Sequence, residues 1–134
     1  MNAIIFGSEQ DYEELSAVLS SLENEPLPAL IIRHIDDYDA LRHELSEKEF
    51  ELIIILADGA EGMEACIGVK KMRPQIPVFW FSDDPYFVAQ SYRLDCTFFS
   101  TKPVLPKRLL KAFEALNYKR NIDYMDSDYY YGVI

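Results

Sequence analysis

Short apolar runs alternate with amphipathic stretches along the first 118 residues of the chain. Between the runs, apolar residues recur every three or four positions, which is the period of a helix with one buried face. Tyr12, Leu15 and Leu22 follow this spacing after the first run. The pattern therefore predicts five strands, each followed by a helix. The predicted strands are 2–7, 29–35, 50–56, 77–81 and 96–100.

The run at 50–56 is the most apolar of the five, as expected for a parallel strand with both faces covered by helices. Five strand–helix units in series predict a parallel sheet between two layers of helices. The simplest strand order for such an α/β doubly wound, flavodoxin-like fold is 2-1-3-4-5. We predict one domain at 1–118, followed by a Tyr- and Asp-rich tail at 119–134 that has too little periodicity to assign.

Capping residues and prolines predict several helix limits. Asp36 and Asp37 are good caps for the second helix, and Asp84 with Pro85 starts a short fourth helix that ends near Arg93. The third helix is predicted from about Gly62 to Met72 and the last from Pro106 to about Tyr118.

The net charge is −10, which argues against a nucleic-acid binder because such affinity rests on Lys and Arg neutralising phosphates. We expect a protein partner, one with a basic surface fitting best. No apolar stretch is long enough to span a membrane. Cys66 and Cys96 lack metal-type spacing, and no signal-peptide pattern precedes them, so we expect buried thiols in a cytoplasmic protein.

Motifs for catalysis or metal binding are weak. His34 and His43 have no acidic or cysteine partner at ligand spacing. The turn at 59–62, GAEG, lacks the Gly-Lys-Ser/Thr ending of a phosphate-binding loop. Capping by Asp84 accounts for the acidic stretch at 82–85. The residues therefore predict no metal site, no cofactor and no enzyme.

Two motifs are more specific. GMEA (62–65) opens the third helix, and TKP (101–103) follows the fifth strand. With their surroundings at 52–82 and 94–104, these motifs resemble response-regulator receiver domains. The resemblance covers about residues 2–118. It implies an aspartate at the tip of the third strand that accepts a phosphoryl group from a histidine kinase. It also implies two acidic residues and a carbonyl that hold Mg²⁺, a hydroxyl residue after the fourth strand, and a lysine before a proline.

Some positions match this pattern. Lys102 and Pro103 fit the lysine and the proline, whose peptide bond is usually cis in the family. Ser82 fits the hydroxyl position, and Phe99 fits the aromatic residue that turns inward or outward on activation. These four residues are the expected switch and pocket.

Other positions depart from the pattern. Counting back five residues from Gly62 puts Ala57 where the phosphoacceptor should be. In place of paired acids, the first loop has Gly7 and Ser8, with Glu9 next. Phosphoryl transfer needs Mg²⁺ held by well-placed carboxylates. The chain therefore resembles a degenerate member, a pseudo-receiver that acts as a phosphorylation-independent protein-interaction module in a bacterial two-component-type system.

Asp58 leaves an alternative open. If the third strand carried a one-residue bulge, Asp58 would be phosphorylated, with Glu9 and Asp11 improvising the Mg²⁺ site. In a regular strand its side chain points away from Lys102 and serves in loop capping. Lys102 would then pair with Asp58 or Glu9, or bind an anion, so a small-ligand domain is a third possibility.

Assembly and the tail complete the expectations. Receiver-like domains often pair through the fourth helix, fifth strand and fifth helix, which suggests a homodimer. The tail has four tyrosines and three aspartates, and we expect part of 122–134 to dock on its own domain or a neighbour's. The predicted pairing face includes Tyr86, Tyr92, Arg93, Phe99, Lys107 and Lys111. The tail residues are Asp123, Tyr124, Asp126, Asp128, Tyr129, Tyr130 and Tyr131.

Overall fold

The structure is a computed structural model that describes residues 1–122, with side chains placed through residue 117. Five parallel strands form one sheet in the order β2-β1-β3-β4-β5, which confirms the predicted topology. The most apolar strand, β3, is central as expected. The strands are β1 Asn2–Phe6, β2 Ile31–Ile35, β3 Leu52–Ile55, β4 Val78–Ser82 and β5 Phe98–Thr101.

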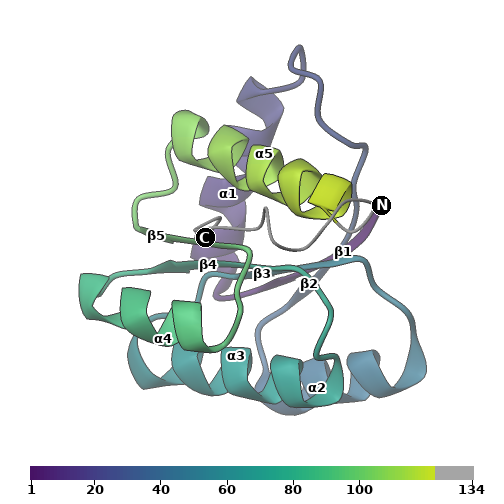
Figure 1. The fold of residues 1–134 in the computed structure, drawn as a ribbon, viewed down its shortest axis with the longest axis vertical. Helices are drawn as coiled ribbons and strands as arrows, with labels where there is room; N and C mark the ends of the chain where they lie inside the picture. The colour runs from purple at the N-terminus through teal and green to yellow at the C-terminus, as the bar shows by residue number, and fades with distance from the viewer. Residues whose placement is uncertain (123–134) are drawn as a thin grey trace.

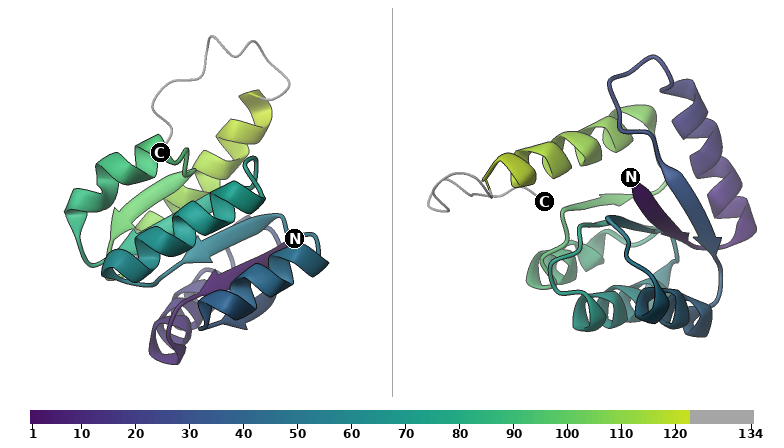
Figure 2. Two further views of the ribbon diagram at one scale, coloured as in Figure 1. Left: turned by 90° about the horizontal axis from the view of Figure 1, so that it is seen from below. Right: turned by 90° about the vertical axis from the view of Figure 1, so that its right-hand side faces the viewer.

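Helices cover both faces of the sheet (Figure 1). One layer holds α1 and α5, and the other holds α2, α3 and α4, which lie across the opposite face in both views (Figures 1 and 2). The helices are α1 Glu9–Ser21, α2 Tyr38–Glu47, α3 Gly59–Met72, α4 Val88–Arg93 and α5 Pro106–Ile122, with a 3₁₀ turn at Pro85–Phe87 before α4.

Two apolar layers separate the sheet from its helices. Side chains alternate between the layers along each strand, so Ile53 and Ile55 face α2 to α4 while Leu52 and Ile54 face α1 and α5. All four of these side chains are fully buried. This burial on both faces explains the continuous apolar run that the sequence shows.

Most predicted caps are confirmed. The Asp37 carboxylate accepts the Ala40 N–H at 2.9 Å at the start of α2. The Asp84 carboxylate accepts the Tyr86 N–H at 2.9 Å before α4, which ends at Arg93 as predicted.

Two predicted helix limits were wrong. Helix α3 begins at Gly59 rather than near Gly62, so the predicted turn at 59–62 is its first turn. Helix α5 continues to Ile122, four residues beyond the predicted end at Tyr118. The expected docking of the tail concerns residues that, apart from Ile122, lie outside the described part, so it stays a prediction.

Both cysteines are fully buried thiols, as expected. Burial raises the pKa of the Cys66 thiol above its usual range, and the neighbouring Cys96 raises it further. Among residues 1–122, no helix is long and apolar enough to span a membrane.

Candidate functional site

A polar cleft lies at the carboxyl edge of the sheet, where the loops after β1, β2 and β3 meet. Parallel strands bring these loops to one edge, which is where open α/β sheets place their sites. The cleft has a volume of about 430 Å³ and five carboxylates in its lining. The lining residues are Ser8, Glu9, Asp11, Asp36, Ala57, Asp58 and Glu61.

Lys102 supplies the positive charge beside these carboxylates. Its Nζ lies 2.8 Å from Asp58 Oδ1 and 3.0 Å from Asp11 Oδ2. The Lys102 side chain is only 17% exposed, and its backbone N–H donates to the Ser82 carbonyl at 2.8 Å. The peptide bond to Pro103 is cis, as the resemblance implied. The ammonium group therefore joins the loop after β5 to the first turn of α1 and to the loop after β3 through two ion pairs.

The position of Asp58 corrects one expectation. The salt bridge between Lys102 and Asp58 was one of the predicted alternatives, but Asp58 was also expected to point away from Lys102. That second expectation was wrong because β3 ends at Ile55, so the side-chain alternation of a strand no longer holds three residues later. Asp58 occupies the N-cap position of α3 but makes no side-chain capping bond there.

Ala57 lies at the base of the cleft with 6% of its surface exposed. Strand β3 ends at Ile55, which pairs with Trp80, so Ala57 lies two residues beyond the end of the strand. Its side chain is a methyl group. A methyl group offers no nucleophile.

Gly7 and Ser8 differ in what they allow. A Cβ on Gly7 would lie 2.8 Å from the buried Cβ of Leu56, closer than side chains pack. Ser8 caps α1, and its hydroxyl oxygen accepts the Asp11 N–H at 3.1 Å. An acid is therefore tolerable at position 8, where Asp also caps well, and is sterically excluded at position 7.

Ser82 is fully buried at the end of β4. Its hydroxyl donates to Asp83 Oδ1 at 3.4 Å and accepts the Asp84 N–H at 3.2 Å. The next residue links the loops after β3 and β4 reciprocally. The Asp83 N–H donates to Asp58 Oδ1 at 3.2 Å, and the Gly59 N–H donates to Asp83 Oδ1 at 3.3 Å. Both hydrogen bonds of the Ser82 hydroxyl therefore stay within the loop after β4.

Phe99 lies half-buried on β5 and packs edge-on against Trp80, with ring centroids 5.3 Å apart. Trp80 is fully buried beneath the first turn of α3. A Cβ on Gly62 would fall on the Ala57 carbonyl oxygen and lie 3.2 Å from the indole Nε1. The glycine of the GMEA motif therefore allows α3 to approach the strand tip.

Metal ligation has little geometric support. Across residues 1–122, no group of three or more His, Cys, Asp or Glu side chains is placed to hold a metal ion. His34 instead hydrogen-bonds the Gly7 carbonyl through Nε2 at 2.9 Å and stacks on Tyr12 with ring centroids 4.3 Å apart. These contacts give His34 a structural role beside the first loop.

Sequence reasoning missed three acidic residues of this edge. The sequence predicts Asp36 only as a cap, Glu61 only as part of a turn, and Asp83 only as part of a capping stretch. Asp36 and Glu61 line the cleft, and Asp83 ties its neighbouring loops. The available signal was that Asp36 and Asp83 directly follow β2 and β4 and that Glu61 lies in the first turn of α3 after β3, because loops after parallel strands meet at one edge.

No family model matches the chain, and no curated protein matches it. Solved structures do. A signal receiver domain of an HD domain-containing protein from Pseudomonas fluorescens is similar at a TM-score of 0.70 and 19% identity, covering 90% of this chain and 97% of that one. The chain has the receiver fold.

Two further structures agree. The receiver domain of the Francisella response regulator 1452 has a TM-score of 0.65 and 14% identity, over 90% of this chain and 98% of its own. A Burkholderia pseudomallei response regulator was solved with a phosphorylated aspartic acid, a calcium ion and citrate. It has a TM-score of 0.63 and 13% identity, over 93% of this chain and 74% of its own.

Proposed function

We propose that this chain is a pseudo-receiver, a protein-interaction module of two-component-type signalling in the cytoplasm that works without phosphorylation. The observation that carries the proposal is Ala57. It follows the end of β3 by two residues, is buried and lines the acidic cleft, and the resemblance to receiver domains puts the phosphoacceptor at this position. The receiver frame is present, and the group that would accept phosphate is a methyl.

The metal side of the chemistry supports the same conclusion. Mg²⁺ needs near-octahedral oxygen ligands, of which one or two are usually carboxylates. Gly7 has no room for such a side chain, and the Asp11 carboxylate is engaged by Lys102. A Mg²⁺ ion would have to displace that ammonium group as well as shed its own water. We therefore expect no cofactor.

The contrast with the Burkholderia structure is chemical. That protein carries a phosphorylated aspartic acid. This chain shares its fold and has Ala57 at the position that the resemblance assigns to the acceptor. Asp58, one residue later, is 47% exposed and holds Lys102 at 2.8 Å. In our proposal this ion pair replaces phosphorylation as the contact that positions the loops.

Output through protein contacts is supported by the surface of α4. Tyr86, Val88 and Tyr92 are 86%, 52% and 67% exposed, which is high for side chains of this size. Exposed aromatic residues favour interfaces. Arg93, Lys107 and Lys111 are also exposed nearby on α4 and α5, whereas Phe99 packs inward on Trp80. We propose this face as the contact for a homodimer or another protein.

Sedimentation velocity of the full chain tests the proposal. We expect the same size distribution with and without acetyl phosphate and Mg²⁺, because our proposal gives the cleft no group that accepts phosphate. If the chain pairs, Tyr86→Ser with Tyr92→Ser should weaken pairing. The matched control is Ile31→Ser, since Ile31 is 68% exposed on the far edge strand. A distribution that shifts on adding the phosphodonor would contradict the proposal.

A working receiver is the second candidate, because Asp58, Asp11 and Glu9 line one cleft. It would need Asp58 as the acceptor, so a phosphoryl adduct on Asp58 would establish it. A small-anion site has less support, because the five carboxylates repel anions. Inorganic phosphate should therefore leave the melting temperature unchanged.

A further inference from the structure

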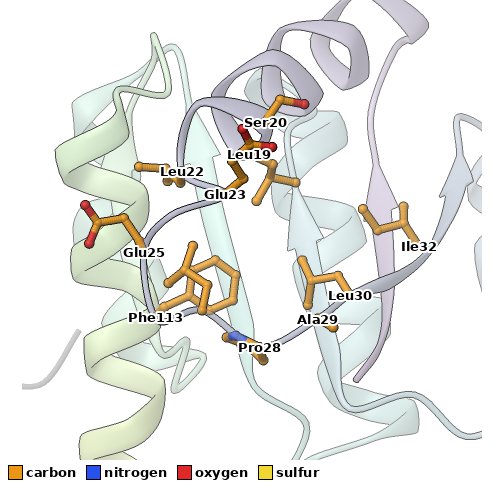
Figure 3. Close-up of a pocket in the computed structure, with 11 residues that line it drawn as sticks. Leu19, Ser20, Leu22, Glu23, Glu25, Pro28, Ala29, Leu30, Ile32 and Phe113 are labelled. Carbon is orange, nitrogen blue, oxygen red and sulfur yellow. The ribbon is translucent and has the colours of Figure 1, made fainter.

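An apolar groove of about 490 Å³ lies away from the cleft, between α1, the connection at 22–30, β2 and α5. Figure 3 shows Phe113 of α5 on one side of the groove and Leu30 and Ile32 on the other. The connection enters β2 at its amino end, so the groove lies toward the amino edge of the sheet. Its apolar lining residues include Leu19, Leu22, Leu27, Leu30, Ile32 and Phe113.

The lining suits a side chain that is apolar in its body and polar at its tip. Apolar side chains form most of the groove, while Glu23 and Glu25 add two exposed carboxylates. A tyrosine ring fits this arrangement, since it buries large apolar area and its O–H donates a hydrogen bond. The volume is in the range of pockets that hold small ligands or a few side chains.

Helix α5 forms part of the groove and ends not far beyond it. It contributes Phe113 to the groove and ends at Ile122, nine residues later, which is about 13.5 Å along a helix. Twelve residues, 123–134, follow this end. Fully extended, twelve residues reach about 40 Å, so the segment is long enough to fold back to the groove.

The segment carries the matching side chains. Tyr124 follows α5 almost at once, and Tyr129, Tyr130 and Tyr131 follow a few residues later. We propose that this groove is the docking site of the chain's own segment 123–134, with a tyrosine ring as the anchor. Because the segment is tethered, its effective concentration at the groove is of millimolar order, which favours docking within one molecule.

Charge gives this docking a signature. Asp123, Asp126 and Asp128 accompany the tyrosines, and Glu23 and Glu25 are at the groove. These like charges oppose docking, so added salt should strengthen it by screening the repulsion. Docking of a basic partner in the same groove would weaken with salt instead.

Spin labelling of the full chain tests the proposal. Ser127→Cys provides a labelling site in the segment, while Cys66 and Cys96 are fully buried and should not react. We expect the methyl signals of Leu30 and Ile32 to lose most of their intensity through paramagnetic broadening. The loss should not depend on protein concentration, and serine at all four tyrosine positions, 124, 129, 130 and 131, should reverse it.

Ala29 offers a matched pair of groove variants, because it is exposed and lines the groove. Ala29→Glu should reduce the broadening and Ala29→Lys should increase it, since the segment is acidic. Groove signals that keep their intensity would overturn the proposal. So would broadening of unlabelled, isotope-enriched protein by a spin-labelled copy, which would make a second molecule the occupant.

Discussion

The acidic cleft and the apolar groove lie at opposite edges of one sheet and are built differently. The cleft gathers loops from the carboxyl ends of the strands and holds them with ion pairs and hydrogen bonds around Lys102, Asp58 and Asp83. The groove is formed mainly by hydrocarbon from α1, α5 and the entry to β2. Polar contacts therefore fix the first region, and apolar contact dominates the second.

In our proposal, this difference indicates which surfaces recognise a partner. In the cleft, the Lys102 ammonium group is paired with two carboxylates, and Ala57 offers only a methyl group. The loops of the cleft are already held in place without a phosphoryl group. We therefore propose that recognition uses surfaces outside the cleft, namely the exposed face of α4 and, by our inference, the groove.

Gly7→Asp should have the largest effect on the cleft. The new side chain meets Leu56 and its charge enters a packed site, so the free energy of unfolding should fall by about 3 kcal/mol. Urea denaturation measures this. Ser8→Asp is the control and should change stability by about 0.5 kcal/mol or less, because Asp also caps α1. Equal stability of the two variants would show that the first loop shifts to accommodate the new side chain. The acidic pair at positions 7 and 8 could then be rebuilt.

Lys102→Met should have an intermediate effect. Removing the ammonium group leaves Asp11 and Asp58 facing each other without a counter-charge, and we expect a loss of about 1.5 kcal/mol at low salt. The loss should shrink in 1 M salt, about the level at which screening acts within a few ångströms. Lys111→Met, at an exposed position on α5, is the control. A loss that does not depend on salt would mean that packing, rather than charge, holds this edge.

The smallest effect concerns Cys66, which is buried between the sheet and the layer of α2, α3 and α4. Because the pKa of the Cys66 thiol is raised on folding, the folded state keeps a proton that the unfolded state loses above about pH 9. Stability contributed by this group is present below that pH and lost as the pH rises. We expect the wild type to lose about 1 kcal/mol more than Cys66→Ala between pH 8 and pH 10. Denaturation curves at both pH values give the comparison, and parallel losses would show that the thiol is solvated.

Much of the fold was predictable because it follows from local pattern. Apolar periodicity located all five strands, and alternation of strands with helices gave the parallel order. Capping aspartates located the start of α2 and the start of the 3₁₀ turn that precedes α4 from side-chain chemistry alone. The GMEA motif predicts a start of α3 near Gly62, whereas the helix begins at Gly59.

The site was predictable only in part, because its contacts join distant loops. Spacing from Gly62 identified Ala57, and TKP identified Lys102. The pairing of Lys102 with Asp11 spans 91 residues, and only the folded sheet brings the two together. The orientation of Asp58 was missed because strand alternation was extended past the end of β3. Nothing in the local sequence at 22–30 indicates that this connection forms one wall of a groove.

The intact mass of the full chain after incubation with acetyl phosphate and Mg²⁺ tests the central claim most directly. We predict an unchanged mass, both for the wild type and for Ala57→Asp alone, because the acid missing at the first loop still leaves the metal unsupported. Ser8→Asp combined with Ala57→Asp is the informative companion, since it adds acids where the structure has room. A mass increase of one phosphoryl group on Asp58 of the unmodified chain would contradict the account.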